Sequence, residues 1–350
     1  MAHTIGVIAG DGIGKEVIPA GIAAIEKATR GTGVSVSFSD LPWSCEYYLK
    51  HQRMMDEDGY ERMAKFDALY MGALGAPGVS DAASAGLILG IRQKFDQYVN
   101  LRPMRLLAGL SSPLGHRSAA DIDMICVREN SEGEYSGVGG RIHRGTPHEV
   151  AQQVGVFTRH GIERILRYGF EVAAKRPRKT LASATKSNAL THSMVLWDEV
   201  AEIVRADYPT VEYRKYHVDA LAARMITHPQ TLDVMVTSNL FGDILTDIGS
   251  AISGSLGIAP GANINPTRLY PSMFEPIHGS APDIAGQGIA NPIGAIWAGA
   301  LMLEHLGHRD LHDKVLGAIE RVVAAGNVRT PDLGGTAKTK DVADAIVGEI

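Results

Sequence analysis

Residues 4–28 read TIGVIAGDGIGKEVIPAGIAAIEKA, and this stretch decides the fold. It begins with an apolar run, passes through a glycine-rich turn at 10–14, and continues with apolar residues at helical spacing. This order predicts a buried strand, a tight turn and an amphipathic helix. Apolar runs and helical patterns keep alternating further along the chain. Strands that alternate with helices over such a length predict an α/β fold.

The same patterns locate the other predicted elements. Strands are expected at 34–39, 67–71, 122–127, 180–183, 211–217 and 234–237. Helices are expected at 45–50, 58–65, 150–174, 190–206, 238–253, 292–306, 310–325 and 340–350.

Length and composition narrow the class of protein. The chain has 350 residues, which suggests two domains at about 150 residues per domain. Its net charge of -5 argues against a nucleic acid or an anionic membrane surface as the main partner. Two cysteines, Cys45 and Cys126, cannot form a disulfide framework or a CxxC metal site. The opening residues lack the layout of a signal peptide, and the long uncharged stretches at 248–267 and 285–303 are interrupted by polar or helix-breaking residues. We therefore expect a soluble, cytoplasmic protein.

The glycine-rich turn GDGIG at 10–14 allows two interpretations. It is similar to a dinucleotide-binding turn, with Asp40 as the partner of a ribose. However, its last glycine comes one residue early, and Asp40 lies about thirty residues beyond the turn, where the motif places its acidic residue at about twenty. Asp11 would also place a carboxylate among the phosphates. The spacing therefore favours a structural turn.

Two aspartates, Asp243 and Asp247, lie four residues apart in the predicted helix at 238–253. That spacing stacks their carboxylates on one helix face, about 6 Å apart at Cβ, where like charges destabilise the helix unless a cation neutralises them. Carboxylate oxygens suit Mg²⁺ or Mn²⁺. A solvated acidic face is the alternative, although the neighbours are largely apolar and no Lys or Arg is close in the sequence. Asp219, at the start of another expected helix, is a candidate third ligand.

Four arginines form the next group: Arg92, Arg102, Arg105 and Arg128. Arg128 follows the apolar run IDMICV, and an arginine at the end of a buried strand is costly unless it meets an anion. Three converging guanidiniums would bind a dicarboxylate substrate. Alternatively, each arginine pairs with a structural carboxylate such as Asp96 or Glu129. Spacing alone leaves both interpretations open.

Two further side chains could move protons. Lys186 comes directly after an apolar strand in the turn SATKSN, and Tyr135 follows Arg128 in VRENSEGEYSG. A lysine close to a dication and to arginines can act as a general base near neutral pH. The alternative is an ordinary surface lysine.

A loop rich in Gly, Pro and Ala, EPIHGSAPDIAGQGIANP, spans 275–292 and leads into a predicted helix. Such a loop can let the peptide N–H groups meet the pyrophosphate of a cofactor. If a nicotinamide cofactor lies there, Asp283 would accept hydrogen bonds from its ribose hydroxyls and repel a 2′-phosphate, which favours NAD over NADP. No Lys or Arg occurs between Arg268 and Arg309 to bind that phosphate. A plain surface loop is the alternative.

Taken together, the motifs resemble the β-decarboxylating dehydrogenases of the isocitrate/isopropylmalate dehydrogenase family. The matching segments are GDGIGKEV, FDQYVNLRP, VRENSEGEYSG, SATKSNAL, SNLFGDILTDIG and EPIHGSAPDIAGQGIANP, which appear in family order and span nearly the whole chain. The segment WSCEYYLKHQRMM, with FDQYVNLRP and SATKSN, is similar to the tartrate/D-malate branch.

This resemblance implies an isopropylmalate dehydrogenase-like two-domain α/β fold that is not a Rossmann fold. It implies a large discontinuous domain at 1–101 and 254–350, which carries the cofactor loop, and a second domain at 102–253 with the metal, the base and the dimer interface. The active site would lie in the cleft between them, and a homodimer would share residues between its two sites.

The resemblance also assigns a role to each candidate residue. Carboxylates of the substrate would bind Arg92, Arg102 and Arg128. Tyr135 would donate a proton, and Lys186 of the neighbouring subunit would be the base. The metal would be bound by Asp243, Asp247 and the neighbour's Asp219. The cofactor would contact Glu275, His278, Gly279, Ser280, Ala281, Pro282, Asp283 and Asn291. Expected cofactors are NAD, Mg²⁺ or Mn²⁺, and a monovalent cation.

The expected reaction is oxidative decarboxylation of a malate-type 2-hydroxy acid, with D-malate or tartrate as the first choice. The helix DAASAGLILGIR at 81–92 would contact the C3 substituent of the substrate and determine specificity for it. Ile88 and Leu89 match the apolar pair that contacts this substituent in isopropylmalate enzymes. Ala85 stands where the tartrate/D-malate branch usually has Trp and the isopropylmalate branch has Glu, and the segment is about one residue short. The resulting space keeps 3-isopropylmalate or another 3-alkylmalate as an alternative. A non-catalytic regulatory subunit is the alternative from another class, although it predicts damage at the catalytic positions, which are intact.

Overall fold

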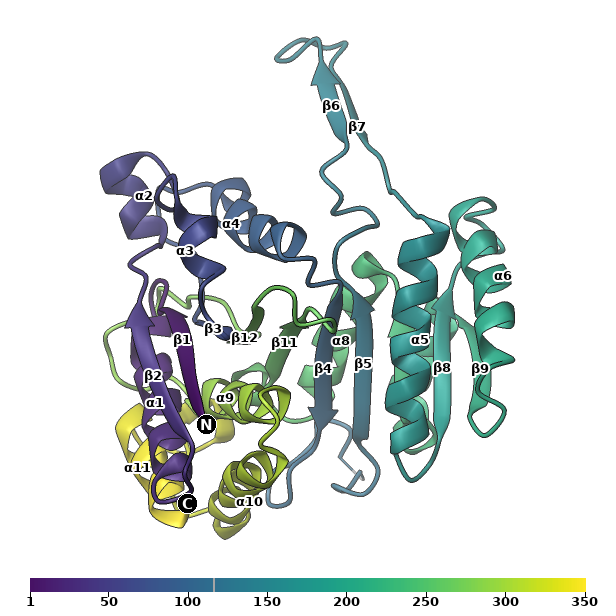
Figure 1. Ribbon diagram of the computed structural model, residues 1–350. Helices are drawn as coiled ribbons and strands as arrows, with labels where there is room; N and C mark the ends of the chain where they lie inside the picture. Colours follow the sequence, from purple (N-terminus) through teal and green to yellow (C-terminus); the bar gives the residue numbers. More distant parts are fainter. Residues whose placement is uncertain (116) are drawn as a thin grey trace.

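The apolar runs of the sequence form one ten-stranded sheet in the computed structural model, which describes residues 1–115 and 117–350 (Figure 1). The strand order is β2-β1-β3-β12-β11-β4-β5-β10-β8-β9. The bounds are β1 Ala2–Ile8, β2 Ser35–Asp40, β3 Ala68–Met71, β4 Val99–Arg105, β5 Asp123–Glu129, β8 Thr180–Thr185, β9 Glu212–His217, β10 Val234–Thr237, β11 Pro260–Ile264 and β12 Ser272–Pro276.

Two parallel groups of strands meet at the centre of this sheet. Strands β2, β1, β3 and β12 are parallel to one another, and so are β5, β10, β8 and β9. Between them, β11 pairs antiparallel with β12 and β4, and β4 pairs antiparallel with β5. The predicted domain ranges would divide the sheet within β4, between residues 101 and 102; these ranges stay a prediction.

Helices cover the sheet (Figure 1). They are α1 Gly14–Thr29, α2 Cys45–His51, α3 Gly59–Met63, α4 Asp81–Lys94, α5 Arg159–Lys175, α6 Ser193–Arg205, α7 Val218–Thr227, α8 Asn239–Ile252, α9 Ile293–His305, α10 Arg309–Ala325 and α11 Thr339–Glu349, with short 3₁₀ turns at Pro229–Thr231, Leu256–Ile258 and Pro331–Leu333. The uncharged stretch 285–303 contains α9, which is buried over 293–303 and packs against α1, α10 and β12. Within the described ranges, no helix is long and apolar enough to cross a membrane.

The prediction of one helix over 150–174 is wrong. Residues Val150–Gln153 form strand β7, which pairs with β6 (Gly139–Ile142) in a hairpin that projects from the body (Figure 1). Helix α5 begins only at Arg159, where the hydroxyl of Thr158 accepts a hydrogen bond from the Gly161 amide at 2.9 Å. The periodicity also missed β4, which has seven residues, and β11 and β12, which have five each.

The glycine-rich turn at 10–14 has a structural role. Gly10 and Gly12 have φ angles of 75° and 51°, in the region that favours glycine. Between them, the buried Asp11 carboxylate accepts hydrogen bonds from the backbone amides of Cys45 (2.9 Å), Glu46 (3.2 Å) and Gly75 (3.1 Å). This carboxylate thus ties the turn to the start of α2 and to the loop after β3, and it is not directed at a phosphate site.

We predict that Asp11→Ala lowers the free energy of unfolding by about 3 kcal/mol, because a buried amide left without an acceptor costs roughly 1–3 kcal/mol. Asp40→Ala is the matched control, since Asp40 is exposed and is expected to change stability by less than about 0.5 kcal/mol. Urea unfolding measures both changes. Equal losses in the two variants would contradict the role given to Asp11.

Candidate active site

The site is built on one face of the central strands. In the antiparallel register, Asn100 of β4 lies opposite Arg128 of β5 and opposite Asn263 of β11. Arg102 is two residues further along β4, and alternate residues of a strand point to the same face. Asn100, Arg102, Arg128 and Asn263 therefore share that face, and all four are buried.

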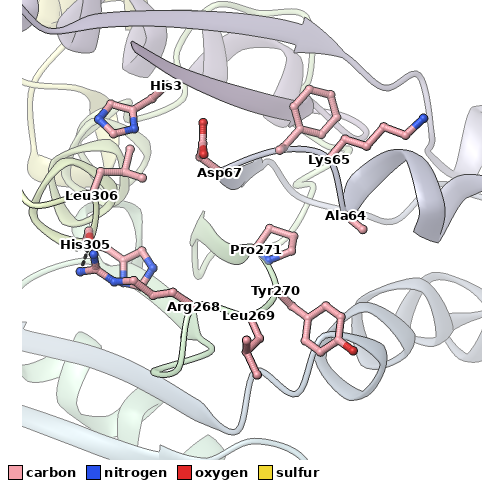
Figure 2. Close-up of a pocket in the computed structure, with 11 residues that line it drawn as sticks. His3, Ala64, Lys65, Asp67, Arg268, Leu269, Tyr270, Pro271, His305 and Leu306 are labelled. Carbon is pink, nitrogen blue, oxygen red and sulfur yellow. Dashed lines mark hydrogen bonds between the residues drawn. The ribbon is translucent and has the colours of Figure 1, made fainter. Parts of the chain in front are cut away.

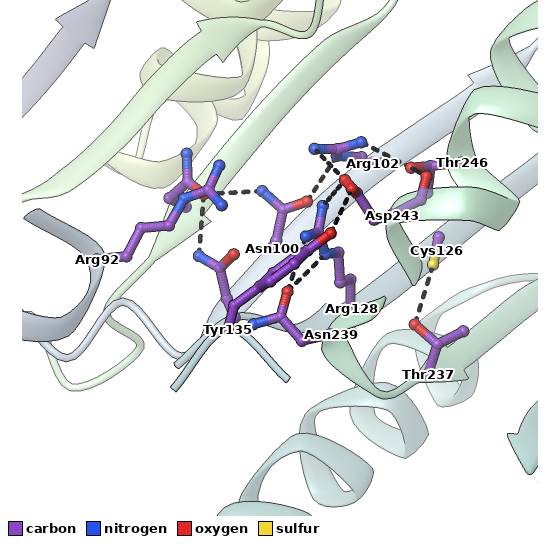
Figure 3. A network of polar contacts seen from close by, with 12 residues as sticks. Arg92, Asn100, Arg102, Cys126, Arg128, Tyr135, Thr237, Asn239, Asp243 and Thr246 are labelled. Atoms are coloured by element: carbon purple, nitrogen blue, oxygen red, sulfur yellow. Dashed lines mark hydrogen bonds and ion pairs between the residues drawn. The ribbon is translucent and has the colours of Figure 1, made fainter. Parts of the chain in front are cut away.

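Arg128 is the most enclosed of the three predicted substrate arginines, with 1% of its surface exposed. Its Nε and Nη2 atoms donate hydrogen bonds to the Asn239 Oδ1 atom at 3.1 and 2.7 Å, and Nη1 donates to the Asp243 carboxylate (Figure 3). Its guanidinium also lies 5.7 Å from the centre of the Tyr135 ring. Burial, reinforced by the charge of Arg102, lowers the pKa of Arg128 to about 10.

Arg102 is held in the same network. Its Nε atom donates to Asn100 Oδ1 at 2.7 Å, and Nη1 donates to the Thr246 hydroxyl at 2.6 Å, while Nη2 lies 3.9 Å from the Asp243 carboxylate (Figure 3). Burial lowers its pKa, as does the charge of Arg92. A bound anion would offset the repulsion between these buried positive charges.

Arg92 reaches this network from α4. It forms a buried ion pair with Glu275 of β12 at 3.1 Å, and the Asn263 amide donates to the same carboxylate oxygen at 2.7 Å. The Asn263 Oδ1 atom accepts from the Asn100 amide at 2.8 Å, which connects Arg92 to Arg102. The three predicted arginines therefore converge.

Other side chains in the arginine segments belong elsewhere. Arg105 pairs with Glu320 at 2.5 Å, and Asp96 pairs with Arg164. Glu129 accepts hydrogen bonds from the backbone amides at 131 and 132. Asp96 and Glu129, the structural partners considered from the sequence, thus do not pair with the three converging arginines.

The two helical aspartates differ in their surroundings. Asp243 lies against Arg128 and accepts a hydrogen bond from the Tyr135 hydroxyl at 3.0 Å. Burial opposes its ionisation, but Arg128 and Arg102 hold the pKa of this carboxyl below its usual value. Asp247 is one turn further along α8, and burial together with the charge of Asp243 raises its pKa. A cation beside both would relieve this repulsion, so the pair fits a divalent metal.

Lys186 and Asp219 form a separate pair. Lys186 follows β8, Asp219 lies in the first turn of α7, and the Nζ atom donates to the Asp219 carboxylate at 2.6 Å. Among residues 1–115 and 117–350, no group of three or more His, Cys, Asp and Glu could hold a metal ion. A single chain is not expected to gather the predicted metal ligands, because the prediction takes Asp219 from a second subunit.

The predicted cofactor loop packs against the N-terminal turn. The Ile13 amide donates to the Ser280 carbonyl at 2.9 Å, and the Glu16 carboxylate accepts from the Gly286 amide at 2.6 Å. The His278 Nδ1 atom lies 3.0 Å from the Gly279 carbonyl, while its Nε2 atom is buried and has no hydrogen-bond partner within the described part of the chain. Burial lowers the pKa of this imidazole, so it is neutral and able to bond a ligand.

The far end of this loop is held by a residue that the sequence reasoning missed. Asp332 accepts hydrogen bonds from the Asn291 amide at 3.0 Å and from the Ser255 hydroxyl at 2.6 Å. Asp283 is exposed, and within residues 1–115 and 117–350 its carboxylate makes no hydrogen bond or ion pair that would compete with a ribose hydroxyl. Glu275, predicted beside the cofactor, forms an ion pair with Arg92, and its contact with the cofactor stays a prediction. The loop therefore fits a nucleotide whose ribose meets Asp283.

Helix α4 presents the predicted specificity residues. Ala85 is exposed and Ile88 and Leu89 are half-buried, while Leu87 and Ile91 anchor the helix in the core. A Cβ atom on Gly90 would lie 2.3 Å from the Tyr60 hydroxyl oxygen and 3.6 Å from the Cζ atom behind it, so α3 fixes how closely α4 approaches.

Comparisons with known proteins agree with this architecture. The isocitrate/isopropylmalate dehydrogenase family model matches residues 4–346. The chain belongs to this family. It is 54% identical to a D-malate dehydrogenase (decarboxylating) of Escherichia coli K12, over 98% of this chain and 97% of the relative. A tartrate dehydrogenase/decarboxylase of Pseudomonas putida is 51% identical, over 99% and 97%.

A solved structure confirms the fold. Isocitrate dehydrogenase from Methylococcus capsulatus superposes with a TM-score of 0.89 at 34% identity, over 99% of each chain. The prediction of an α/β fold of the isopropylmalate dehydrogenase type is therefore confirmed, together with the resemblance to the tartrate/D-malate branch.

We predict an energetic coupling of at least about 1 kcal/mol between Gly90 and Tyr60. In the Tyr60→Phe variant, Gly90→Ala is expected to raise the free energy of unfolding by roughly 0.5–1 kcal/mol, because alanine has a higher helix propensity than glycine. When Tyr60 keeps its hydroxyl, the methyl group added by Gly90→Ala would clash with the hydroxyl oxygen, so the increase in stability is lost or reversed. Urea unfolding of the four proteins measures the cycle. Purely additive changes would show that Tyr60 does not set the position of α4.

Proposed function

We propose that this protein catalyses the NAD- and divalent-metal-dependent oxidative decarboxylation of a malate-type 2-hydroxy acid, D-malate or tartrate. The observation that carries the proposal is the convergence of Arg92, Arg102 and Arg128 beside Asp243 and Tyr135 (Figure 3). Buried guanidiniums of this kind bind carboxylates by charge-assisted hydrogen bonds. The names of the relatives, which are decarboxylating dehydrogenases for D-malate and tartrate, support the same reaction.

The metal would be held by Asp243, Asp247 and Asp219 of the partner subunit. When bound, Mg²⁺ or Mn²⁺ supplies Lewis acidity for the hydroxyl and carboxylate of the substrate. Arg128 already neutralises part of the charge of Asp243, so α8 can keep two carboxylates on successive turns before a cation arrives. The loop at 278–291 would hold NAD, with Asp283 accepting from a ribose.

The proton transfers would be carried by two side chains of the homodimer. Lys186 of the partner subunit, as a neutral amine, would take the proton of the C2 hydroxyl, and its hydrogen bond to Asp219 would orient the amine. Tyr135 would return a proton to the carbon that loses the carboxylate as CO₂. Burial, together with the neighbouring Asp243 carboxylate, raises the pKa of Tyr135. This phenol would therefore stay protonated until it donates its proton to the carbon that has lost CO₂.

The β6–β7 hairpin supports the proposal of a homodimer. The hairpin projects away from the body, and both of its strands are exposed along their whole length (Figure 1). A lone two-stranded hairpin is marginally stable in water and needs a surface to pack on. Ile142 is 59% exposed and Val150 44% exposed, so the hairpin offers apolar side chains to a second copy.

A 3-alkylmalate substrate is a second candidate. Ala85 is exposed on α4 in the segment that leads to Arg92, where it leaves space beside Ile88 and Leu89. A substituent at C3 that is larger than hydrogen or hydroxyl would occupy this space and gain contact with the two apolar side chains.

A substrate panel tests the proposed function and separates the two candidates. Purified protein with NAD and Mn²⁺ is offered D-malate, L-tartrate, 3-isopropylmalate and isocitrate, while the absorbance of the reduced cofactor is followed. Turnover of D-malate or tartrate with CO₂ release is expected. Turnover of none of the four acids would overturn the proposal.

We predict that Ala85→Trp shifts this selectivity toward the small acids. Filling the space with an indole should lower kcat/KM for 3-isopropylmalate relative to D-malate by at least about tenfold, since one methylene in an apolar pocket is worth roughly 10–200-fold. Ala82→Trp, exposed one turn earlier on α4, is the control. An unchanged ratio would show that position 85 does not face the C3 substituent.

Lys186→Met is expected to lower kcat by at least about 100-fold, because a positioned general base contributes roughly 10²–10⁴-fold. Binding of NADH and of Mn²⁺, followed by fluorescence and by calorimetry, should be retained. Lys179→Met, at the other end of β8, is the matched control and should keep full turnover. Near-normal turnover in Lys186→Met would exclude Lys186 as the base.

Removal of the hairpin tests the shared site. The Val154 amide bonds to the Val138 carbonyl at 2.8 Å, so residues 139–153 can be replaced by an Asn-Gly turn without opening the chain. The shortened protein is expected to sediment as a monomer and to lose turnover, because Lys186 and Asp219 then reach no neighbouring site. A monomer that keeps its activity would contradict the sharing of residues.

A further inference from the structure

A groove lies on the face of the central strands opposite the candidate active site. Leu101, Pro103 and Arg105 of β4 alternate with Asn100 and Arg102, so they point away from the candidate active site. They line a groove of about 610 Å³ whose walls are α5 on one side and α9 and α10 on the other. We call this cavity the rear groove. Its volume falls within the range of sites for small molecules and cofactors.

The rear groove continues into two smaller hollows. One, of about 470 Å³, lies along α5 beside Tyr98, and the other, of about 370 Å³, lies beside His3 and Asp67. Arg268 and His305 line all three cavities, and Figure 2 shows their side chains together. Arg268, in the loop between β11 and β12, therefore places a positive charge where the three cavities adjoin one another.

The cations of the groove divide into two kinds. Three arginines on its walls are neutralised within the chain: Arg105 by Glu320, Arg176 by Asp123 and Asp233, and Arg309 by Glu304 and Asp313. In the part of the chain that the structure describes, Lys175 and Arg268 have no carboxylate partner. Both of them line the rear groove and the hollow along α5.

The geometry of Arg268 holds its charge at the groove. Its Nη2 atom donates to the His305 carbonyl at 2.6 Å, near the end of α9. Its φ angle is 58°, a conformation that is uncommon for a residue other than glycine. Burial and the charge of Arg268 lower the pKa of His305 to about 4. At neutral pH this imidazole is therefore uncharged, and Arg268 is the only charged member of this pair.

The rear groove also exposes apolar side chains along its floor and walls. Leu101, Ile125, Val172 and Leu316 are half-buried on its floor and walls, and the ring of Tyr168 lies on the α5 side. These apolar side chains are therefore exposed to water in the same groove as the charges of Lys175 and Arg268. An organic molecule with an apolar body and an anionic group would cover these side chains and satisfy both charges at once.

We propose that the rear groove binds a small organic anion, with a phosphate or carboxylate group between Lys175 and Arg268 and its apolar body against Leu101 and Tyr168. Lys175 ends α5, whereas Arg268 belongs to the β11–β12 loop. A bound anion would therefore join two walls that come from distant parts of the chain. The proposal does not depend on the reaction at the other face of the sheet.

Isothermal titration calorimetry with three probes tests the site: ADP, citrate and inorganic phosphate. The protein is saturated with NADH, which keeps ADP from the cofactor loop. Binding of ADP or of citrate is expected, with inorganic phosphate weaker because it has no apolar body. The stronger of the two organic probes identifies phosphate or carboxylate as the preferred group.

Two charge reversals locate the binding. Lys175→Glu and Arg268→Glu should each weaken the stronger probe by about tenfold or more, as expected for a charge-assisted contact worth over 1.4 kcal/mol. Lys50→Glu, an exposed lysine on α2, makes the same change of net charge elsewhere and should leave affinity unchanged. Lys175 is exposed and forms no ion pair with any residue that the structure describes, so its replacement tests the site even if Arg268→Glu fails to fold.

Three results would overturn the proposal. The first is that none of the probes binds the NADH-saturated protein. The second is that probes bind but Lys175→Glu retains the affinity of the unmodified protein, which would place them at the arginines of the other face. The third is an equal loss in Lys50→Glu, which would mean a general effect of charge.

Discussion

The structure depends on the enclosure of the Arg128 guanidinium. Removing such a charge from water costs several kcal/mol unless hydrogen bonds and an opposite charge replace the lost hydration. Asn239 and Asp243 provide both, and they lie one turn apart at the start of α8. The position of α8 against β5 is thus set by electrostatics as well as by packing. Because Asp243 also meets Tyr135 and lies near Arg102, the same carboxylate connects the groups that would bind and protonate a substrate.

Much of the fold and the site was predictable from the sequence, because both depend on local patterns. The strand-turn-helix at the N-terminus, the aspartate pair of α8 and the three arginines each lie in a short motif that can be interpreted by itself. Strand β10 was predicted with its observed bounds, 234–237. The α/β fold and the family follow from the order of those motifs.

The features that the sequence could not show depend on contacts between residues that lie far apart in the chain. The asparagines Asn100 and Asn263, which connect Arg92 to Arg102, lie 163 residues apart and meet only because β4 and β11 are antiparallel neighbours. The partner of Asp243 was also hidden, because Arg128 is distant in sequence and only the strand register brings it close. The hairpin strand β7 was mistaken for the start of a helix because four exposed residues show no burial pattern.

The strand order has a consequence for synthesis of the chain. Strands β5, β8, β9 and β10 pair with one another and come from one continuous stretch, so they can assemble while translation continues. Strand β3 instead pairs with β12, which leaves the ribosome about 200 residues later, and α1 packs on α9, which follows α1 by about 260 residues. Until then the N-terminal strands keep an unpaired edge, which other chains can add to. The N-terminal strands, although they are synthesised first, therefore complete their pairing only after β12 has been made, and the edge of β3 stays open throughout that interval.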